Sequence, residues 1–129
     1  MEKTETGFSR SRRTGDLSWC ERFGWTISES DGFRLLDAAF GAGLNLIDTA
    51  DVYSRWVSGH KGGESETMIG KWLGKTGKRK HVILATEVGM DMGDGKKGLK
   101  AEYIQQAVGN SLQHLQTGYI DLYQAHQDD

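Results

Sequence analysis

Gly43-Leu44-Asn45-Leu46-Ile47-Asp48-Thr49-Ala50-Asp51-Val52-Tyr53-Ser54 decides the fold, because a short apolar strand over 44–48 runs directly into a polar segment. Two further apolar runs resemble that strand, one over 81–86 and one over 119–124. The run over 81–86 is nearly all apolar, as expected of a parallel strand that is covered on both faces. These three runs therefore predict three strands of one sheet.

Helical periodicity occupies the segments before and between these strands. Ser28-Glu29-Ser30-Asp31 predicts a helix start, with side-chain oxygens for the free N–H groups and acids for the helix dipole. A second helix is expected from Glu64-Ser65-Glu66 to stops at Gly74 and Gly77, and a third ends at Gly118. The apolar faces of the three helices are formed by Phe33, Leu36, Ala39 and Phe40, by Met68, Ile69, Trp72 and Leu73, and by Ile104, Ala107, Val108, Leu112 and Leu115.

Alternation of helices and strands implies a parallel sheet with helical crossovers, and such a sheet closes either as an open doubly wound sheet or as a barrel. No G-x-G-x-x-G follows a strand, so the dinucleotide-fold fingerprint is missing. Polar residues recur instead where the strands end, at Asp48, Glu87 and His126. In a βα barrel that rim is where sites are built. We predict an α/β fold, a partial (β/α)8 TIM barrel of roughly the first four βα units.

The charge and the apolar content of the chain limit the classes of molecule that it is expected to bind. The 129 residues include 18 acidic and 16 basic side chains, a formal charge of −2, which gives no whole-chain electrostatic case for nucleic acid or an anionic membrane. No apolar run approaches the ~20 residues that a membrane helix needs. Cys20 is the single cysteine, so no intrachain disulfide forms, which fits a reducing compartment. We expect a cytoplasmic protein that acts on small molecules.

Asp48, Tyr53 and His126 form a candidate site at the strand ends. Tyrosine is a weak acid that serves as a general acid when a nearby cation favours its phenolate. A neighbouring histidine can hydrogen-bond the same substrate oxygen. On spacing alone the three residues could equally be satisfied structural side chains, so spacing leaves both interpretations open.

The chain resembles the aldo-keto reductase family. The resemblance rests on the segment 43–54, on Gly63-Glu64-Ser65-Glu66, on Ala85-Thr86-Glu87-Val88-Gly89 and on the segment 119–126, in matching order and spacing. It implies a (β/α)8 barrel that reduces an aldehyde or ketone, a small-molecule carbonyl substrate, with NADPH by direct hydride transfer. It also implies that Tyr53 donates the proton, that Asp48 anchors the catalytic lysine and that His126 orients the substrate.

Three departures from that family bear on activity. Glu87 stands where the family has its lysine, and a carboxylate there disfavours the tyrosine phenolate and faces Asp48 as a like charge. A complete barrel needs ~250 residues, about twice the present length. The family's first strand is apolar and Gly-rich, but Ser18-Trp19-Cys20-Glu21-Arg22 takes its place. We expect a truncated and catalytically impaired reductase, with a non-catalytic barrel remnant or interaction module as the alternative. Open sheet edges would also favour self-association.

The remaining features receive simpler interpretations. Residues 1–27 lack a clear period and are expected to be a divergent, poorly ordered segment, whereas 28–129 form the N-terminal half of the barrel. The other histidines have no metal-ligand spacing and are expected at the surface or a strand edge: His60, His81 and His114. Glu64 and Glu66 are explained as helix N-terminal acids. The loop 54–63 is either a wall of a substrate pocket or an exposed loop.

Overall fold

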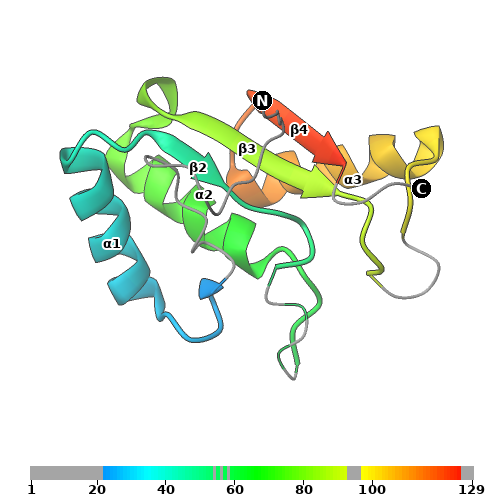
Figure 1. Ribbon diagram of the computed structural model, residues 1–129, viewed down its shortest axis with the longest axis horizontal. Coiled ribbons are helices and arrows are strands. Elements are labelled where there is room, and N and C mark those ends of the chain that lie inside the picture. The colour runs from blue at the N-terminus through cyan, green and yellow to red at the C-terminus, as the bar shows by residue number, and fades with distance from the viewer. Residues whose placement is uncertain (1–21, 54, 56, 58, 93–96, 126–129) are drawn as a thin grey trace, which may run out of the picture.

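The computed structural model describes residues 22–53, 55, 57, 59–92 and 97–125. Helices and strands alternate along the chain, as the sequence predicts (Figure 1). In order, the elements are α1 (Glu29–Gly41), β2 (Leu46–Asp48), α2 (Glu64–Thr76), the 3-10 turn η3 (Arg79–His81), β3 (Ile83–Val88), α3 (Ala101–Leu115) and β4 (Leu122–Ala125).

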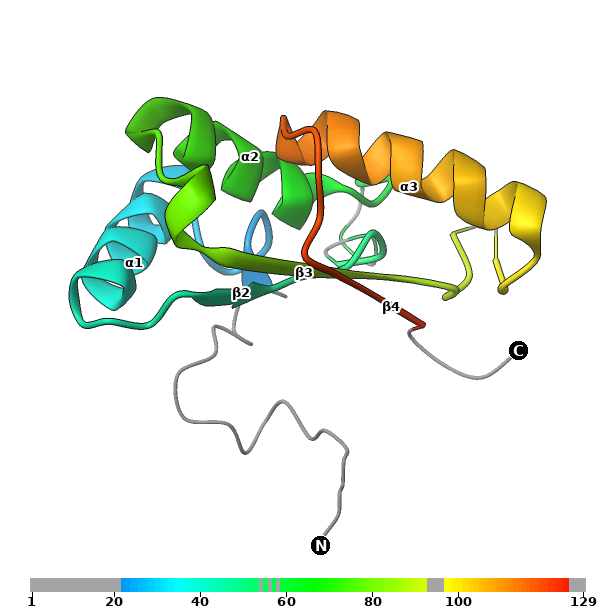
Figure 2. The same cartoon turned by 90° about the horizontal axis from the view of Figure 1, so that it is seen from above.

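The sheet is parallel, with the strand order β2-β3-β4. Asp48 pairs with Ala85, and Glu87 pairs with Gln124. Figure 2 shows all three helices on one face of this sheet. Helices that connect the neighbouring parallel strands of a βα barrel lie on the outer face of its sheet, and the structure confirms the prediction of a partial α/β barrel.

The core lies between the sheet and the helices. Its largest buried side chain is Trp72 of α2, whose indole Nε1 donates a hydrogen bond to Oδ1 of Asp37 at 2.8 Å. Phe23 is also fully buried in this core and forms an isolated bridge with Ile27. Phe23 belongs to the segment 1–27, so part of that segment packs on the barrel; the boundary at residue 28 stays a prediction.

Several element ends follow the sequence and others do not. Ser28 caps α1, because its hydroxyl accepts a hydrogen bond from the backbone N of Asp31 at 3.3 Å. The predicted stop at Gly74 is wrong, since α2 continues to Thr76 and ends at Gly77 in the left-handed region (φ 68°). The predicted end of α3 at Gly118 is also late, since Gln116 takes the left-handed position (φ 54°).

The predicted strands are displaced along the chain. The run over 81–86 becomes β3 at Ile83–Val88, because His81 belongs to η3. Likewise, β4 begins at Leu122 rather than at residue 119. An apolar run reports burial, but hydrogen bonding to the neighbouring strand sets where a strand begins. Among the described residues, no helix has the length and apolarity to cross a membrane.

Candidate active site at the strand ends

Asp48 is the last residue of β2 and is 3% exposed. Its Oδ1 accepts a hydrogen bond from Nε2 of Gln124 in β4 at 3.2 Å. Successive strand residues point to opposite faces, so the observed register places Asp48, Glu87 and Gln124 on the same face of the sheet. Strand β2 therefore places the carboxylate of Asp48 on this face of the sheet.

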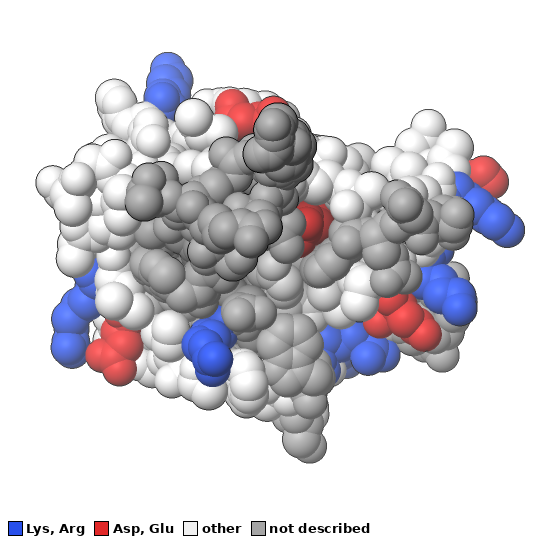
Figure 3. Space-filling model, viewed as in Figure 1, with Lys and Arg blue, Asp and Glu red and all other residues white. Residues whose placement is uncertain are grey.

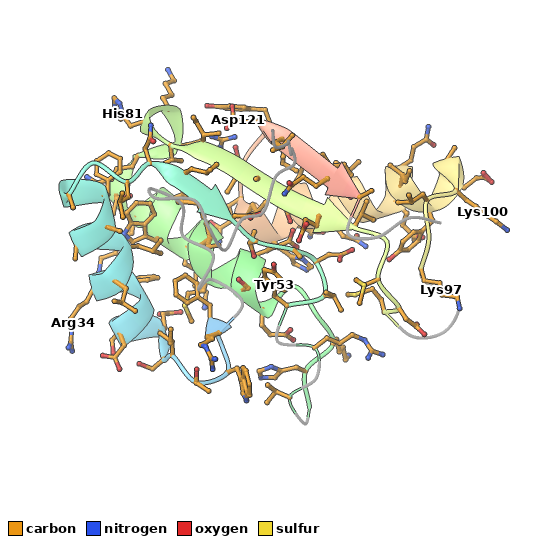
Figure 4. The ribbon with its side chains drawn as sticks, viewed as in Figure 1. Arg34, Tyr53, His81, Lys97, Lys100 and Asp121 are labelled. Carbon is orange, nitrogen blue, oxygen red and sulfur yellow. The ribbon has the colours of Figure 1, made fainter. Side chains whose placement is uncertain are left out.

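Tyr53 lies in the loop that follows β2 (Figure 4) and is 8% exposed. Its hydroxyl donates a hydrogen bond to Oε1 of Glu87 at 3.4 Å, and Glu87 is itself 2% exposed. The loop is held beside β3, because the backbone N of Asp51 donates to the carbonyl of Glu87 at 3.2 Å. The fold thus brings Tyr53 to the residue that stands at the family's lysine position.

The fourth predicted site residue, His126, lies outside the described residues. The structure therefore joins Tyr53 to Glu87 and Asp48 to Gln124 on one sheet face. The roles of all four predicted residues stay predictions. Gln124 was not predicted from the sequence, although it lies two residues before His126 in the segment that carries the resemblance.

Buried carboxylates dominate this region of the described chain. Asp48, Asp51, Glu66 and Glu87 are each at most 7% exposed. Burial, together with the negative charges of Glu66 and Glu87, raises the pKa of Asp51 to about 7. A carboxyl group with that pKa is protonated in a large fraction of molecules near neutrality. The sequence did not mark Asp51 as special, because its burial depends on the helices packed over it.

Glu66 lies in the first turn of α2, as predicted, but it is also buried, and His114 is less exposed than predicted. Glu66 is fully buried; its Oε2 accepts a hydrogen bond from Oγ1 of Thr86 at 2.6 Å, and its Oε1 lies 3.4 Å from Nδ1 of His114. The hydrogen bond with Glu66 raises the pKa of His114. Glu66 therefore ties α2 to β3 and α3, and His114 is only partly exposed. Glu64 does act at the helix start, accepting from the backbone N of Gly62 at 2.9 Å.

The described residues at the strand ends include no metal-binding group and no buried cation for the phosphates of a dinucleotide. No group of three or more of their histidine, cysteine, aspartate and glutamate side chains could hold a metal. Phosphates bind at cationic side chains or free backbone N–H groups, whereas the buried charged groups at these strand ends are carboxylates. In the space-filling view, which has the orientation of Figure 1, the described Lys and Arg atoms lie mainly around the periphery of the molecule (Figure 3).

Comparison with known proteins decides the family. The model of the aldo/keto reductase family matches residues 15–129. The chain belongs to the aldo/keto reductase family. The resemblance carried by the segments 43–54 and 119–126 is therefore confirmed, and with it the barrel architecture.

The proteins that this family member matches include one short protein and several that are longer than this chain. The oxidoreductase YrpG of Bacillus subtilis is 39% identical over 136 residues, which cover 100% of this chain and 41% of YrpG. The 11.2 kDa protein in the crtE 3' region of Pseudescherichia vulneris is 56% identical over 71 residues, which cover 54% of this chain and 69% of that protein. The holo form of the aldo-keto reductase AKR11C1 from Bacillus halodurans superposes with a TM-score of 0.65 at 39% identity, over 82% of this chain and 33% of that structure. The chain thus spans a third to two fifths of the larger relatives.

Proposed function

We propose that this chain carries the first part of an NADPH-dependent site for reducing aldehydes or ketones, and that Glu87 impairs its chemistry. The observation that carries the proposal is the buried hydrogen bond from the Tyr53 hydroxyl to Oε1 of Glu87. A tyrosine that gives its proton to a carbonyl oxygen becomes a phenolate, and a neighbouring carboxylate disfavours that charge. Glu87 also competes with the substrate for the same proton.

In this proposal each of the chain's own site residues has a separate role. Tyr53 supplies the proton to the carbonyl oxygen, His126 orients the substrate, and Asp48, held by Gln124 at 3.2 Å, is the partner that a lysine at position 87 would need. NADPH, when bound to a complete barrel, supplies the hydride. The buried charged residues at the strand ends are carboxylates, which repel the phosphates of that cofactor there, so we expect the isolated chain to bind NADPH weakly.

A Glu87→Lys variant tests the proposal in a barrel completed with the C-terminal part of YrpG. General acid catalysis contributes ~10²–10⁴-fold, so the variant is expected to raise carbonyl-dependent NADPH oxidation by about 10²-fold or more. Glu87→Gln is the matched control, because it removes the carboxylate charge without adding a cation, and we expect a smaller gain from it. Equal activity of Glu87→Lys and the parent barrel would overturn the proposal.

A non-catalytic scaffold is the second candidate, favoured by the apolar side chains on the sheet. Ile83 of β3 is 46% exposed and Leu122 of β4 is 38% exposed. Such residues suit self-association or another partner. Fluorescence titration of the isolated chain with NADPH tests this second candidate, since stoichiometric binding is incompatible with a remnant that has lost the cofactor. The cytoplasmic location stays a prediction; Cys20, on which it rests, lies outside the described residues.

A further inference from the structure

A cavity of about 710 Å³ opens between the loop that follows β2, the start of α2, and α3. Figure 2 shows α3 extending past the end of α2, so no described helix lies beside the first part of α3. The lining includes Asp51, Glu66, Tyr103, Asn110 and His114. The proposed reductase chemistry uses none of these five side chains, so the cavity needs its own explanation.

The loop wall of this cavity is formed partly by backbone. Gly62 and Gly63 line the cavity with φ values of 97° and 82°. A Cβ atom at Gly63 would come within 2.6 Å of Nδ1 of His114, and one at Gly62 within 2.8 Å of the backbone O of Asp51. Glycine at position 63 therefore lets the loop lie close to α3, and glycine at position 62 lets it lie close to the backbone of Asp51.

Asp51 is the unusual member of the lining. It is 7% exposed, and its Oδ1 is buried with no hydrogen-bond donor among the described residues. Glu66 provides the comparison, because both of its oxygens have partners in Thr86 and His114. A buried carboxylate oxygen without a donor destabilises the folded state. Backbone N–H groups of Asp51 and Val52 act on this carboxyl, so the unmet requirement for a donor concerns Oδ1 alone.

The charge around Asp51 indicates the type of donor. Burial is the main reason that the pKa of Asp51 lies near 7, and the negative charges of Glu66 and Glu87 also raise it. A positively charged donor would relieve that repulsion, whereas a neutral hydroxyl would supply only the hydrogen bond. The described residues offer no set of three ligands for a metal ion. The donor that fits is an organic ammonium group.

We propose that this cavity binds a small polar molecule through an ammonium group that donates hydrogen bonds to Asp51. Tyr103, Gln106 and Asn110 of α3 line the cavity and offer hydroxyl and amide groups to the rest of the molecule. Arg55 and Lys61 also line it, and the guanidinium Nε of Arg55 donates to the backbone O of Met92 at 2.9 Å. A ligand that also carries an anionic group would use these two cations.

Calorimetric titration of the full chain at about pH 7 tests the site with three probes: putrescine, L-serine and 1,4-butanediol. Putrescine represents a plain amine, L-serine a zwitterion, and butanediol a neutral molecule with the chain length of putrescine. We expect saturable binding of putrescine or L-serine, with release of about half a proton because a group of pKa near 7 is half protonated there. Butanediol is expected not to bind. Failure of both amines to saturate would overturn the proposal.

Asp51→Asn and Glu102→Gln form a matched pair, since each removes one carboxylate but Glu102 is exposed on α3 outside the cavity lining. Asp51→Asn is expected to weaken binding by about tenfold or more, the effect of losing a charge-assisted hydrogen bond, and Glu102→Gln to leave it unchanged. Equal affinities for the two variants contradict the site. If Asp51→Asn does not fold, carbon-13 NMR of the parent decides: bound amine must lower the titration midpoint of the Asp51 carboxyl, and an unmoved midpoint overturns the proposal.

Discussion

Glu87 joins two parts of the strand-end region, because its Oε1 accepts the hydrogen bond of the Tyr53 hydroxyl and its charge contributes to the raised pKa of Asp51. Replacing it with the isosteric Gln should therefore lower the pKa of Asp51 below about 7. That pKa should stay above its ordinary value, since burial is the larger cause. Carbon-13 NMR titration of the Asp51 carboxyl measures the change. Glu29→Gln on exposed α1 serves as control, and a midpoint equal to that of the parent would contradict the prediction.

Stability should fall as pH rises toward and above neutrality. The pKa of Asp51 is raised to about 7 in the folded chain, so the folded state holds more protons than the unfolded state between the two pKa values. His114 acts in the same direction, because the hydrogen bond with Glu66 raises its pKa and the resulting stabilisation is lost above that pKa. The titratable groups that bear on Asp51 come from four elements: Glu66 of α2, Glu87 of β3, Tyr103 and His114 of α3, and Tyr123 of β4.

Urea unfolding at about pH 6 and about pH 8 measures this dependence. A shift of one pKa unit is worth about 1.4 kcal/mol, so the parent should lose on the order of 1–2 kcal/mol of unfolding free energy across that interval. Asp51→Asn should flatten the profile and leave only the smaller contribution of His114. A parent chain that is more stable at the higher pH would show that the sign is wrong.

Gly70 and Gly74 should respond oppositely to alanine. A Cβ atom at Gly70 would collide with the backbone O of His114 and come within 2.8 Å of the backbone C of Leu115, where α2 and α3 pack closely. Gly70→Ala should therefore cost about 1–3 kcal/mol through overpacking. The matched control is Gly74→Ala, whose Cβ meets only the side-chain Oε1 of Gln116 at 3.5 Å.

Gly74→Ala should gain roughly 0.5–1 kcal/mol from helix propensity, because the position lies inside α2. Urea midpoints of both variants at one pH give the comparison. Stabilisation by both substitutions would mean that α3 does not pack against Gly70 as closely as the structure shows.

The isolated chain should self-associate through its exposed sheet residues. Ile83 and Leu122 are apolar and 46% and 38% exposed. Sedimentation velocity is expected to show a discrete dimer. Leu122→Lys should shift the population toward monomer, whereas Leu35→Lys, at an exposed position of α1 (42%), should not. A monomeric parent at every concentration tested would remove self-association from the proposal.

Local patterns predicted much of the architecture. The Ser28 cap and the alternation of apolar runs with helical periods were confirmed, because capping and hydrophobic periodicity act over a few neighbouring residues. The ends of α2 and α3 were predicted less well. Gly74 is tolerated within α2, and Gln116 rather than Gly118 follows α3, because packing between the helices outweighs the preference of single residues.

The sequence by itself determined that helices and strands alternate, that the chain resembles one reductase family, and that a carboxylate occupies position 87. Only the tertiary structure decided that Glu87 meets Tyr53 and that Glu66 is buried against Thr86 and His114. It also decided that Asp51 lines a cavity while its Oδ1 has no donor in the described part of the chain. The physical reason is distance: burial and charge interactions act between side chains that are far apart in sequence, and the strand register and helix packing alone bring them together.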